Sequence, residues 1–452
     1  MQLGERFAAA GYQLFLVGGS VRDAFLARRD ADFDFDFATN ARPDEVQSLL
    51  DDWADTVFTV GKTFGTIGAI KDGHDVEVTT FRKEVYRDDS RKPHVEYSDD
   101  IETDLSRRDF TINAMAVAFP DVTPIDPHGG AADLVARVLK TPLGPDVSFS
   151  DDPLRMVRLF RFQATLGFEP DPVALAAVRS MAPRLDIVSA ERIRDEFSKL
   201  IVADDPSPAL EGLVDSGLAD RFLPELSGLR MEQDPVHRHK DVLAHTIAVI
   251  QKTSPELIVR LAALLHDIGK PETRAFGPGG VSFHHHEVVG ARLARHRLRA
   301  LRYPREVVTD VSQLVFLHLR PHTLELGWTD SAVRRYVRDA GHLLERLNEL
   351  VRCDVTTGNE RRAKAIQRRI DELEERIERL TEQEELARLR PPIDGRAVMS
   401  YLGIEPGPLV GEVMDVLLEK RIEDGPYSEE EAYRTVRQVA IEKGLADPGS
   451  PV

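Results

Sequence analysis

Two aspartates at alternate positions are the residues of this sequence best suited to phosphoryl-transfer chemistry. Asp34 and Asp36 flank a phenylalanine in a run that alternates acidic with aromatic side chains. Alternate residues of a β-strand lie on one face, so both carboxylates should share a face while the rings enter a core. Neighbouring carboxylates repel each other unless a cation binds them, and hard oxygen ligands suit magnesium. The pattern therefore predicts a Mg²⁺ site that aligns a hydroxyl with the α-phosphate of a nucleotide.

A glycine pair and a third acid could complete such a site. Gly18 and Gly19 follow a short apolar run, and their missing Cβ atoms let backbone amides approach a triphosphate where a helix begins. Glu77 lies in the middle of another apolar run, where an unpaired carboxylate is costly, and is a candidate third metal ligand. Each feature alone also fits a tight turn or a solvated edge strand. Their order and separation favour one site.

The elements that must position these residues follow from the hydrophobic periodicity. Strands are expected at residues 14–17, 32–37, 66–71 and 76–81, and beyond the first third of the chain the pattern becomes helical. The sequence therefore predicts a small α+β head followed by a long all-α body. At residues 361–390, apolar side chains repeat at alternating spacings of four and three. This repeat predicts a long helix packed against its own body rather than an intermolecular coiled coil.

Turn-rich segments divide the chain, whose 452 residues suffice for about three domains with substantial cores. Breaks are expected at residues 204–208, 277–280 and 391–395. The predicted regions are a head at 1–145, a helical neck at 146–205, a helical domain at 206–360 and a helical tail at 361–452.

The composition is that of a globular protein, with 42% apolar and 30% charged residues and no run of about 18 apolar residues. Cys353 is the only cysteine and the start lacks a signal-peptide pattern, so we expect a reduced, cytoplasmic protein.

The net charge of −18 argues at first sight against a nucleic-acid partner. Residues 1–145 carry 26 acids against 16 lysines and arginines, however, whereas residues 291–310 carry six arginines and two acids. The charge distribution therefore leaves room for a local RNA-binding face.

Several blocks together resemble the bacterial (class II) CCA-adding tRNA nucleotidyltransferase and poly(A) polymerase family. They are Gly-Gly-Ser-Val-Arg-Asp at residues 18–23, Asp-Phe-Asp-Phe-Ala-Thr at 34–39, Arg-Arg-Asp-Phe-Thr-Ile-Asn-Ala at 107–114, and Asp-Asp-Pro-Leu-Arg at 151–155 with Arg158 and Arg161. The blocks follow the family's order. The resemblance implies a polymerase-β-like nucleotidyltransferase head.

The resemblance also implies a role for each matching residue. Asp34 and Asp36 would bind the catalytic magnesium ions. Asp152 and Arg155 would hydrogen-bond the incoming base, so that protein side chains act as the template. The other nucleotide-binding residues are expected to be Gly18, Gly19, Arg22, Arg108, Asp109, Asn113, Arg158 and Arg161.

Base selection by an acid and an arginine makes physical sense. A carboxylate accepts from the exocyclic amino group shared by cytosine and adenine, and an arginine donates to the neighbouring ring acceptor. Asp152 and Arg155, three residues apart on a predicted helix, would share a face, although composition alone favours a helical salt bridge between them. Residues 189–196 resemble the helix that supports this template.

Residues 82–97 resemble a mobile loop of the family, and their presence argues against an enzyme that adds only the terminal A.

A second group of candidate metal ligands lies in the predicted helical body. His266 and Asp267 are adjacent after an apolar run, and imidazole nitrogen with carboxylate oxygen suits a first-row divalent ion. With His245 and Asp354 they resemble the HD phosphohydrolase superfamily, whose ligands follow the order His, His-Asp, Asp. The resemblance implies a site for Mg²⁺, Ni²⁺ or Mn²⁺ that hydrolyses cyclic phosphates or 2′-nucleotides; a degenerate scaffold that binds tRNA would carry the same residues. Further candidate ligands are His286 and His318.

These patterns predict a CCA-adding tRNA nucleotidyltransferase that uses CTP and ATP and binds tRNA, with the oligomeric state left open. Arginines at 292–305 and 361–369 and a glycine-rich helix start at 407–411 are candidate contacts for tRNA phosphates, although such clusters are more often solvated. A poly(A) polymerase of the same family would fit many of these residues, but a basic tail would suit it and residues 422–452 are acidic. A protein nucleotidyltransferase with an HD hydrolase and a non-enzymatic RNA-binding relic each fit part of the pattern.

Overall fold

The computed structural model describes most of the chain, which divides into two units. The described residues are 2–27, 35–85, 94–98, 100–231, 241–277, 280–323, 329–355, 360–384 and 389–445. One unit comprises Met1–Arg230 with Arg297–Tyr303, and the other comprises Met231–His296 with Pro304–Val452. Among the described helices, none is long and apolar enough to cross a membrane. The four regions expected from the sequence remain a prediction.

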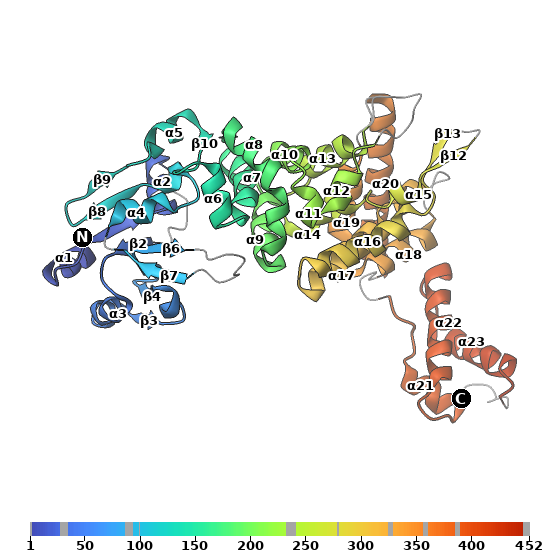
Figure 1. Ribbon diagram of the computed structural model, residues 1–452. Coiled ribbons are helices and arrows are strands. Elements are labelled where there is room, and N and C mark those ends of the chain that lie inside the picture. The colour runs from blue at the N-terminus through green and yellow to red at the C-terminus, as the bar shows by residue number, and fades with distance from the viewer. Residues whose placement is uncertain are drawn as a thin grey trace. The chain divides into compact units, whose positions relative to one another are not determined.

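A seven-stranded mixed sheet forms the head (Figure 1). Its strands, in the order in which they pair, are β3 (Thr56–Phe58), β4 (Thr66–Lys71), β5 (His74–Thr80), β2 (Phe35–Thr39), β1 (Leu14–Val17), β8 (Ala116–Phe119) and β9 (Thr123–Ile125). Within this sheet only β2 and β5 pair in parallel. The four strands predicted from the sequence are confirmed within the described residues, which do not include 32–34.

Apolar cores lie on both faces of this sheet. One core contains residues of α1 (Gln2–Ala9) and α3 (Pro43–Asp51), and the other contains residues of α4 (Ile101–Ser106). In β1, Leu14 enters the first core and Phe15 enters the second, as a period of two requires. Because packing fixes the strands from both sides, polar side chains between the apolar ones are held in place.

Smaller elements complete the head. They are α2 (Gly19–Phe25), η1 (Lys62–Phe64), β6 (Arg82–Val85), β7 (His94–Tyr97), η2 (Thr111–Asn113) and α5 (Gly130–Ala136). Strands β6 and β7 pair in antiparallel fashion, so the described parts of the segment expected to be a loop form a hairpin.

A group of helices follows the head in the first unit. They are α6 (Pro145–Asp151), α7 (Leu154–Leu166), α8 (Pro172–Met181), η3 (Ala182–Ile187), α9 (Ala190–Ile201), α10 (Ser207–Asp215), α11 (Ala219–Phe222) and α12 (Pro224–Gly228), with β10 (Val138–Leu139) paired to β11 (Glu169–Pro170). Helix α7 packs against α9 and α10. A Cβ atom on Gly212 of α10 would lie 2.4 Å from the Phe160 ring, so glycine permits the close approach of these two helices.

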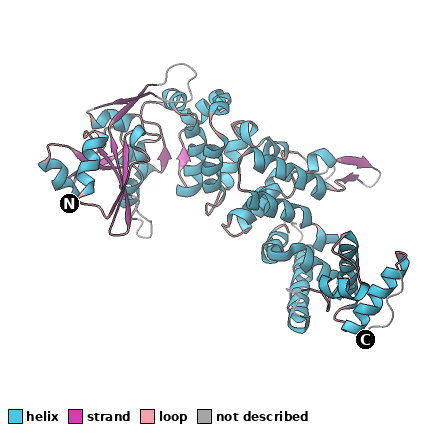
Figure 2. Ribbon diagram, turned by 90° about the horizontal axis from the view of Figure 1, so that it is seen from below, coloured by secondary structure: helices cyan, strands magenta, loops and turns pink. Residues whose placement is uncertain are grey.

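The second unit is built almost entirely of helices, as Figure 2 shows by colour. Its elements before the long helix are α13 (Val242–Lys252), α14 (Leu257–Leu265), α15 (Lys270–Thr273), β12 (Ala275–Gly277), β13 (Gly280–Ser282), α16 (His286–Ala300), α17 (Arg305–Leu317), η4 (Arg320–Thr323), α18 (Asp330–Ala340), η5 (Gly341–Leu343) and α19 (Leu344–Cys353). The end of α16 belongs to the first unit. Helix α14 is buried from Val259 to Leu265, and its one charged residue, Arg260, donates to the Thr253 backbone carbonyl at 3.1 Å.

The predicted long helix is α20 (Glu360–Glu384). Its apolar stripe, Ile370, Leu373, Ile377 and Leu380, is at most 8% exposed, and the helix packs against α18 and α19. Packing against its own body, as expected from the sequence, is therefore confirmed. The tail contains α21 (Gly395–Leu402), α22 (Pro408–Asp424) and α23 (Glu429–Glu442), which share a separate apolar core.

Candidate active site and metal centre

Two acids lie side by side in the head sheet. Strand β2 pairs with β5 in a register that places Asp36 opposite Glu77. The flanking residues Phe35 and Phe37 pack against the first apolar core, so both carboxylates lie on the other face. Asp36 is half-buried and Glu77 is exposed, so pairing register rather than burial favours Glu77 as a metal ligand. Asp34 lies outside the described residues.

Gly18 brings the block predicted to bind phosphate close to Asp36. Its φ of 76° places it in the left-handed region, at the N-cap of α2, where glycine is favoured. A Cβ atom here would lie 3.1 Å from Arg108 Nη1 and 3.8 Å from Asp36 Oδ2. The glycine loop, the predicted catalytic acid and the arginine of a third sequence block therefore surround one position.

Asp104 fixes the arginines of that block, a contact that we did not predict from the sequence. This carboxylate is 1% exposed and forms ion pairs of 2.8 Å with Arg107 and 3.2 Å with Arg108. Burial raises the pKa of Asp104, but the two guanidinium groups outweigh burial and hold the pKa below its usual range. The sequence signal for this contact is that Asp104 lies four residues before Arg108, a spacing that brings two side chains together on a helix.

Both carboxylate oxygens of Asp109 accept hydrogen bonds from groups of the protein. Its Oδ1 accepts hydrogen bonds from the Phe110 backbone amide (2.8 Å) and Asn113 Nδ2 (3.0 Å), and its Oδ2 accepts from Arg158 Nε (2.9 Å) and Nη2 (2.5 Å). Burial raises the pKa of Asp109, but Arg158 and Asn113 outweigh burial and hold the pKa well below its usual range. We therefore interpret Asp109 as a residue that positions Asn113 and Arg158.

Asn113 connects this cluster to the glycine loop. Arg22 Nη1 donates to Asn113 Oδ1 at 2.7 Å, and Arg22 also forms a 2.7 Å ion pair with Asp23. A Cβ atom on Gly19 would lie 3.6 Å from Arg22 Nη2. The structure thus links three separate sequence blocks through side-chain contacts.

Asp152 and Arg155 do not form one face of a helix, and that expectation is wrong. Asp152 has an extended backbone at the end of α6, and α7 begins only at Leu154, so the two residues do not belong to one continuous helix. Arg155 is 8% exposed, and its guanidinium donates to Ser148 Oγ (2.9 Å) and to the backbone carbonyl of Arg107. The proline at the junction is compatible with the break because it lacks an amide proton.

Helix α9 supports the predicted template residues, as expected. Arg192 donates to Asp152 Oδ2 at 2.7 Å. Glu196, 7% exposed, forms ion pairs of 3.0 Å with Arg158 and 2.6 Å with Arg161. Burial lowers the pKa of Arg161 to about 10, which leaves the guanidinium protonated at neutral pH. One helix therefore orients both an acid and a pair of arginines.

In one of the arginine clusters predicted to contact tRNA phosphates, some of the arginines are already paired with acids of the protein. In α16, Arg297 pairs with Glu225 at 2.8 Å and Arg292 with Glu272 at 2.9 Å. Within the described part of the chain, Arg295 and Arg299 form no ion pair. The cluster therefore offers less free charge than its sequence implies.

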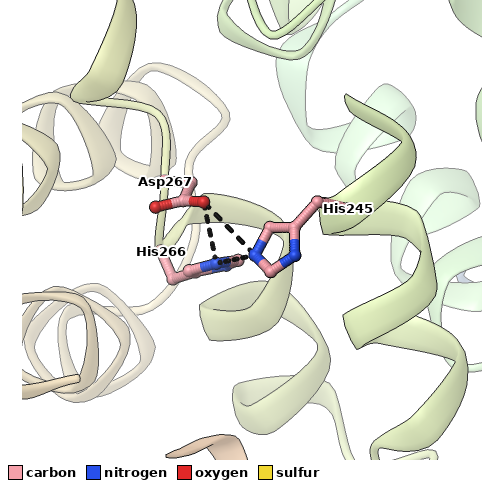
Figure 3. Close-up of side chains that lie close together, drawn as sticks. All are labelled: His245, His266 and Asp267. Carbon is pink, nitrogen blue, oxygen red and sulfur yellow. Dashed lines mark hydrogen bonds and ion pairs between the residues drawn. The ribbon is translucent and has the colours of Figure 1, made fainter. Parts of the chain in front are cut away.

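In the second unit, four predicted metal ligands converge. His245 Nε2 lies 3.2 Å from His266 Nε2, 3.4 Å from Asp267 Oδ2 and 3.0 Å from Asp354 Oδ1. His266 Nε2 lies 3.2 Å and 3.4 Å from the same two carboxylate oxygens. Figure 3 shows His245 on one helix and the adjacent residues His266 and Asp267 on another segment, with the three side chains pointing toward one another. Metal–ligand bonds of about 2.1 Å would separate such ligand atoms by about 3.0–3.4 Å, so the set fits one divalent ion.

The charges of this centre also suit a cation. Burial lowers the pKa of His266, but Asp267 and Asp354 outweigh burial and raise the pKa to about 10. The imidazolium therefore serves as the counter-charge of two carboxylates, a role that a divalent ion would take over. Lys270 Nζ, 2.6 Å from Asp267 Oδ2, adds a further positive charge that we did not predict from the sequence.

Comparisons with known proteins match this arrangement along the chain. Family models match in order: a poly A polymerase head domain at residues 14–140, a probable RNA and SrmB-binding site of polymerase A at 167–229, and an HD domain at 242–380. The A-adding tRNA nucleotidyltransferase of Deinococcus radiodurans is 34% identical over 96% of both chains. The chain belongs to the tRNA nucleotidyltransferase family of CCA-adding and A-adding enzymes. Another member of this family, the CCA-adding enzyme of Geobacillus thermodenitrificans, is 31% identical over 90% of this chain and 88% of its own.

The fold of this tRNA nucleotidyltransferase agrees with that of a solved relative. The crystal structure of the Bacillus stearothermophilus CCA-adding enzyme in complex with CTP aligns with a TM-score of 0.69, at 24% identity, over 98% of this chain and 97% of the other. A nucleotidyltransferase head followed by a helical body with an HD domain is therefore confirmed.

Proposed function

We propose that this chain builds and repairs the 3′-terminal CCA of tRNA from CTP and ATP without a nucleic-acid template. The observation that carries the proposal is the convergence of Asp36, Gly18 and Arg108 on one position, next to the pairing partner Glu77. Full-length identity to tRNA nucleotidyltransferases supports it. Because tRNA, CTP and ATP are cytoplasmic in bacteria, we also propose that the chain acts in the cytoplasm.

Different residues of the head would take different roles in the transfer reaction. Asp34 and Asp36 would hold Mg²⁺ together with Glu77, which lies opposite Asp36, and the ion when bound would polarise the α-phosphate and favour ionisation of the tRNA 3′-hydroxyl. Arg108 and the backbone amides after Gly18 would bind the triphosphate and offset its charge. The hydroxyl oxygen attacks the α-phosphorus, and pyrophosphate leaves.

Base selection is assigned to Asp152 and Arg155. Asp152 Oδ1 accepts from the Leu154 amide and Oδ2 accepts from Arg192, and each oxygen keeps a second lone pair as a free acceptor. Arg155 uses two of its nitrogens on Ser148 and the Arg107 carbonyl, so donors remain for a base acceptor. These partners would orient the pair toward the amino group and ring acceptor that cytosine and adenine share.

Stepwise incorporation tests this function. We expect the full chain to extend a tRNA that lacks its last three nucleotides with CTP, and one that ends in CC with ATP, but neither with UTP or GTP. Arg155→Ala should lose this discrimination. Extension by ATP alone of any RNA would indicate a poly(A) polymerase, and use of ATP only on a tRNA ending in CC would indicate an A-adding enzyme; either result would overturn the proposal.

A second activity, metal-dependent phosphate hydrolysis, is proposed for the HD centre. The observation that favours it is the convergence of ligand atoms from His245, His266, Asp267 and Asp354 at 3.0–3.4 Å. The expected ions are Mg²⁺, Ni²⁺ or Mn²⁺, and the expected substrates are cyclic phosphates and 2′-nucleotides. His266→Ala should abolish metal-stimulated phosphate release and leave nucleotide addition intact; phosphate release by the variant at the parent rate would contradict the assignment.

A further inference from the structure

We propose that the exposed ring of Phe58 stacks on the 3′-terminal base of the tRNA that receives the next nucleotide, and that Gly68 provides the bare surface over which that nucleotide lies. The inference rests on the proposed function, because it assigns a binding position for the RNA substrate of the same site. It depends on one row of residues that crosses the head sheet from Asp36 to Phe58.

The register of four neighbouring strands places Phe58 in line with the predicted catalytic acids. Asp36 of β2 lies opposite Glu77 of β5, and Glu77 lies opposite Gly68 of β4. Gly68 in turn lies opposite Phe58 of β3. The residues next to these four within the strands all pack in or against the first apolar core, so the four share the other face of the sheet.

This face of the sheet is accessible at β3, β4 and β5. Among the described residues, the second apolar core contains none from these three strands. Phe58 is 44% exposed, and the three atoms nearest to a Cβ built on Gly68 all belong to Phe58, at 3.7–4.0 Å. Single exposed apolar residues are common on protein surfaces, so the inference depends on the position of Phe58 in the row rather than on its exposure.

The place of the triphosphate determines the side from which the RNA must approach. A Cβ on Gly18 would lie close to both Arg108 and Asp36, and Gly18 follows β1, which pairs with β2 on the edge away from β5. In phosphoryl transfer the attacking and leaving oxygens lie roughly in line, on opposite sides of the phosphorus. If pyrophosphate leaves toward Gly18, the 3′-hydroxyl must approach from the side of Glu77 and β4.

The nucleotide that carries this hydroxyl would then lie over Gly68. Neighbouring strands are about 4.8 Å apart, so Phe58 lies about 10 Å from Glu77 across the sheet. A ribose whose 3′-oxygen is at Glu77 would cover Gly68, which has no side chain to obstruct it, and would direct its base toward the Phe58 ring. Proteins commonly hold the bases of single-stranded RNA ends by stacking them on such rings.

Stacking suits a substrate whose terminal base changes during the reaction. The acceptor ends first in the last base of the shortened tRNA and then in C, so one position must hold different bases in turn. Every base has an aromatic face, which makes stacking tolerant of sequence, whereas hydrogen bonds to a base edge favour one base. Phe58 would therefore hold each successive end, while Asp152 and Arg155 select the incoming nucleotide.

A cycle that combines a protein change with an RNA change tests this contact. The full chain and Phe58→Ala are each titrated, without nucleotides, with a tRNA that lacks its CCA end and with the same tRNA carrying an abasic 3′-terminal nucleotide. We expect Phe58→Ala to weaken binding of the first tRNA about tenfold and binding of the abasic tRNA not at all. Equal losses on both tRNAs would overturn the inference.

Two further variants separate stacking from a structural role. Phe58→Trp keeps an aromatic face and should bind both tRNAs as the parent does. Phe276→Ala removes a 69% exposed phenylalanine from a strand of the second unit, and as the matched control it should also behave as the parent. Failure of Phe58→Trp to restore the difference between the two tRNAs would contradict stacking.

Gly68 gives a second test, based on kinetics. The branched side chain of Gly68→Val suits a strand but would occupy the space assigned to the ribose. We expect its KM for tRNA to rise at least about tenfold, with an unchanged KM for CTP. Parent kinetics in a Gly68→Val chain that melts like the parent would overturn the inference.

The binding cycle also separates this inference from the proposed function. Base-dependent binding by a chain that adds no CTP would support stacking on Phe58 and contradict the proposed function. Addition of C, C and A by a chain that loses the same affinity for both tRNAs in Phe58→Ala would do the reverse.

Discussion

The head site and the HD centre place their charged residues in opposite ways. In the head, Asp36 and Glu77 lie on paired strands of one sheet, and both are accessible to solvent. In the HD centre, His266 and Asp267 are at most 1% exposed, and their partners come from separate helices. The head is therefore organised by charge around solvent-accessible acids, whereas the HD centre depends on close packing. Charge changes should therefore damage the first site, and small changes of volume should damage the second.

The largest effect is expected from Asp36→Ala in the head. Because loss of this carboxylate weakens the binding of magnesium, nucleotide transfer to tRNA should fall by at least about 10³-fold. Metal-stimulated phosphate release by the HD centre should not change. Initial rates of both reactions on one preparation measure the contrast. A parallel loss of both activities would show that the two sites are not independent.

Gly269→Ala should have the next largest effect, on the HD centre alone. The added Cβ would lie 2.2 Å from the His286 carbonyl oxygen and 2.7 Å from the Gly290 amide nitrogen, so the backbone must shift. A displacement of about 1 Å can reduce activity about 10²-fold, and we expect phosphate release to fall by this factor. Gly228→Ala, whose Cβ would meet no atom within 4 Å, is the control. Unchanged hydrolysis in Gly269→Ala would contradict the role of packing.

A smaller effect is expected from Asp104→Asn in the head. The variant removes the buried charge that fixes Arg107 and Arg108, so the KM for CTP and ATP should rise about tenfold while kcat changes less. Asp100→Asn, at the N-cap of the same helix, keeps a capping acceptor and should match the parent. A drop in kcat without a change in KM would contradict a role in triphosphate binding.

The smallest effect is expected from Arg192→Ala. Arg192 is 54% exposed and forms an ion pair with Asp152, and exposed pairs contribute about 1 kcal/mol or less. The KM for both nucleotides should therefore rise less than about fivefold, whereas Asp152→Ala should lose base selection. Equal losses in the two variants would mean that Arg192 reads the base itself.

The sequence predicted the parts of the molecule in which local pattern determines structure. Strands β1 and β4 have the predicted limits because their apolar runs are bounded by turn residues, and the stripe of α20 is buried as its spacing indicates. The four HD ligands, predicted from a family resemblance, do converge.

Other features depend on contacts between distant segments. The break between Asp152 and Arg155 lies at Pro153, whose ring disfavours a helical Asp152, but helical periodicity does not show that Arg155 will be buried against Ser148 and Arg107. The buried position of Asp104 has the same origin, since a short polar segment does not show which acid will be enclosed. Likewise, the orientation of His318 toward Asp267 depends on how separate helices pack.

One measurement tests the central claim that a template-independent transferase site and a separate metal centre share this chain. Parent, Asp36→Ala and His266→Ala are incubated with CTP, ATP and a tRNA that lacks its CCA end, and the products are resolved to single nucleotides. We predict addition of C, C and A by the parent and by His266→Ala, and no addition by Asp36→Ala. Transfer by Asp36→Ala at the parent rate, or failure of the parent to incorporate CTP, would contradict the account.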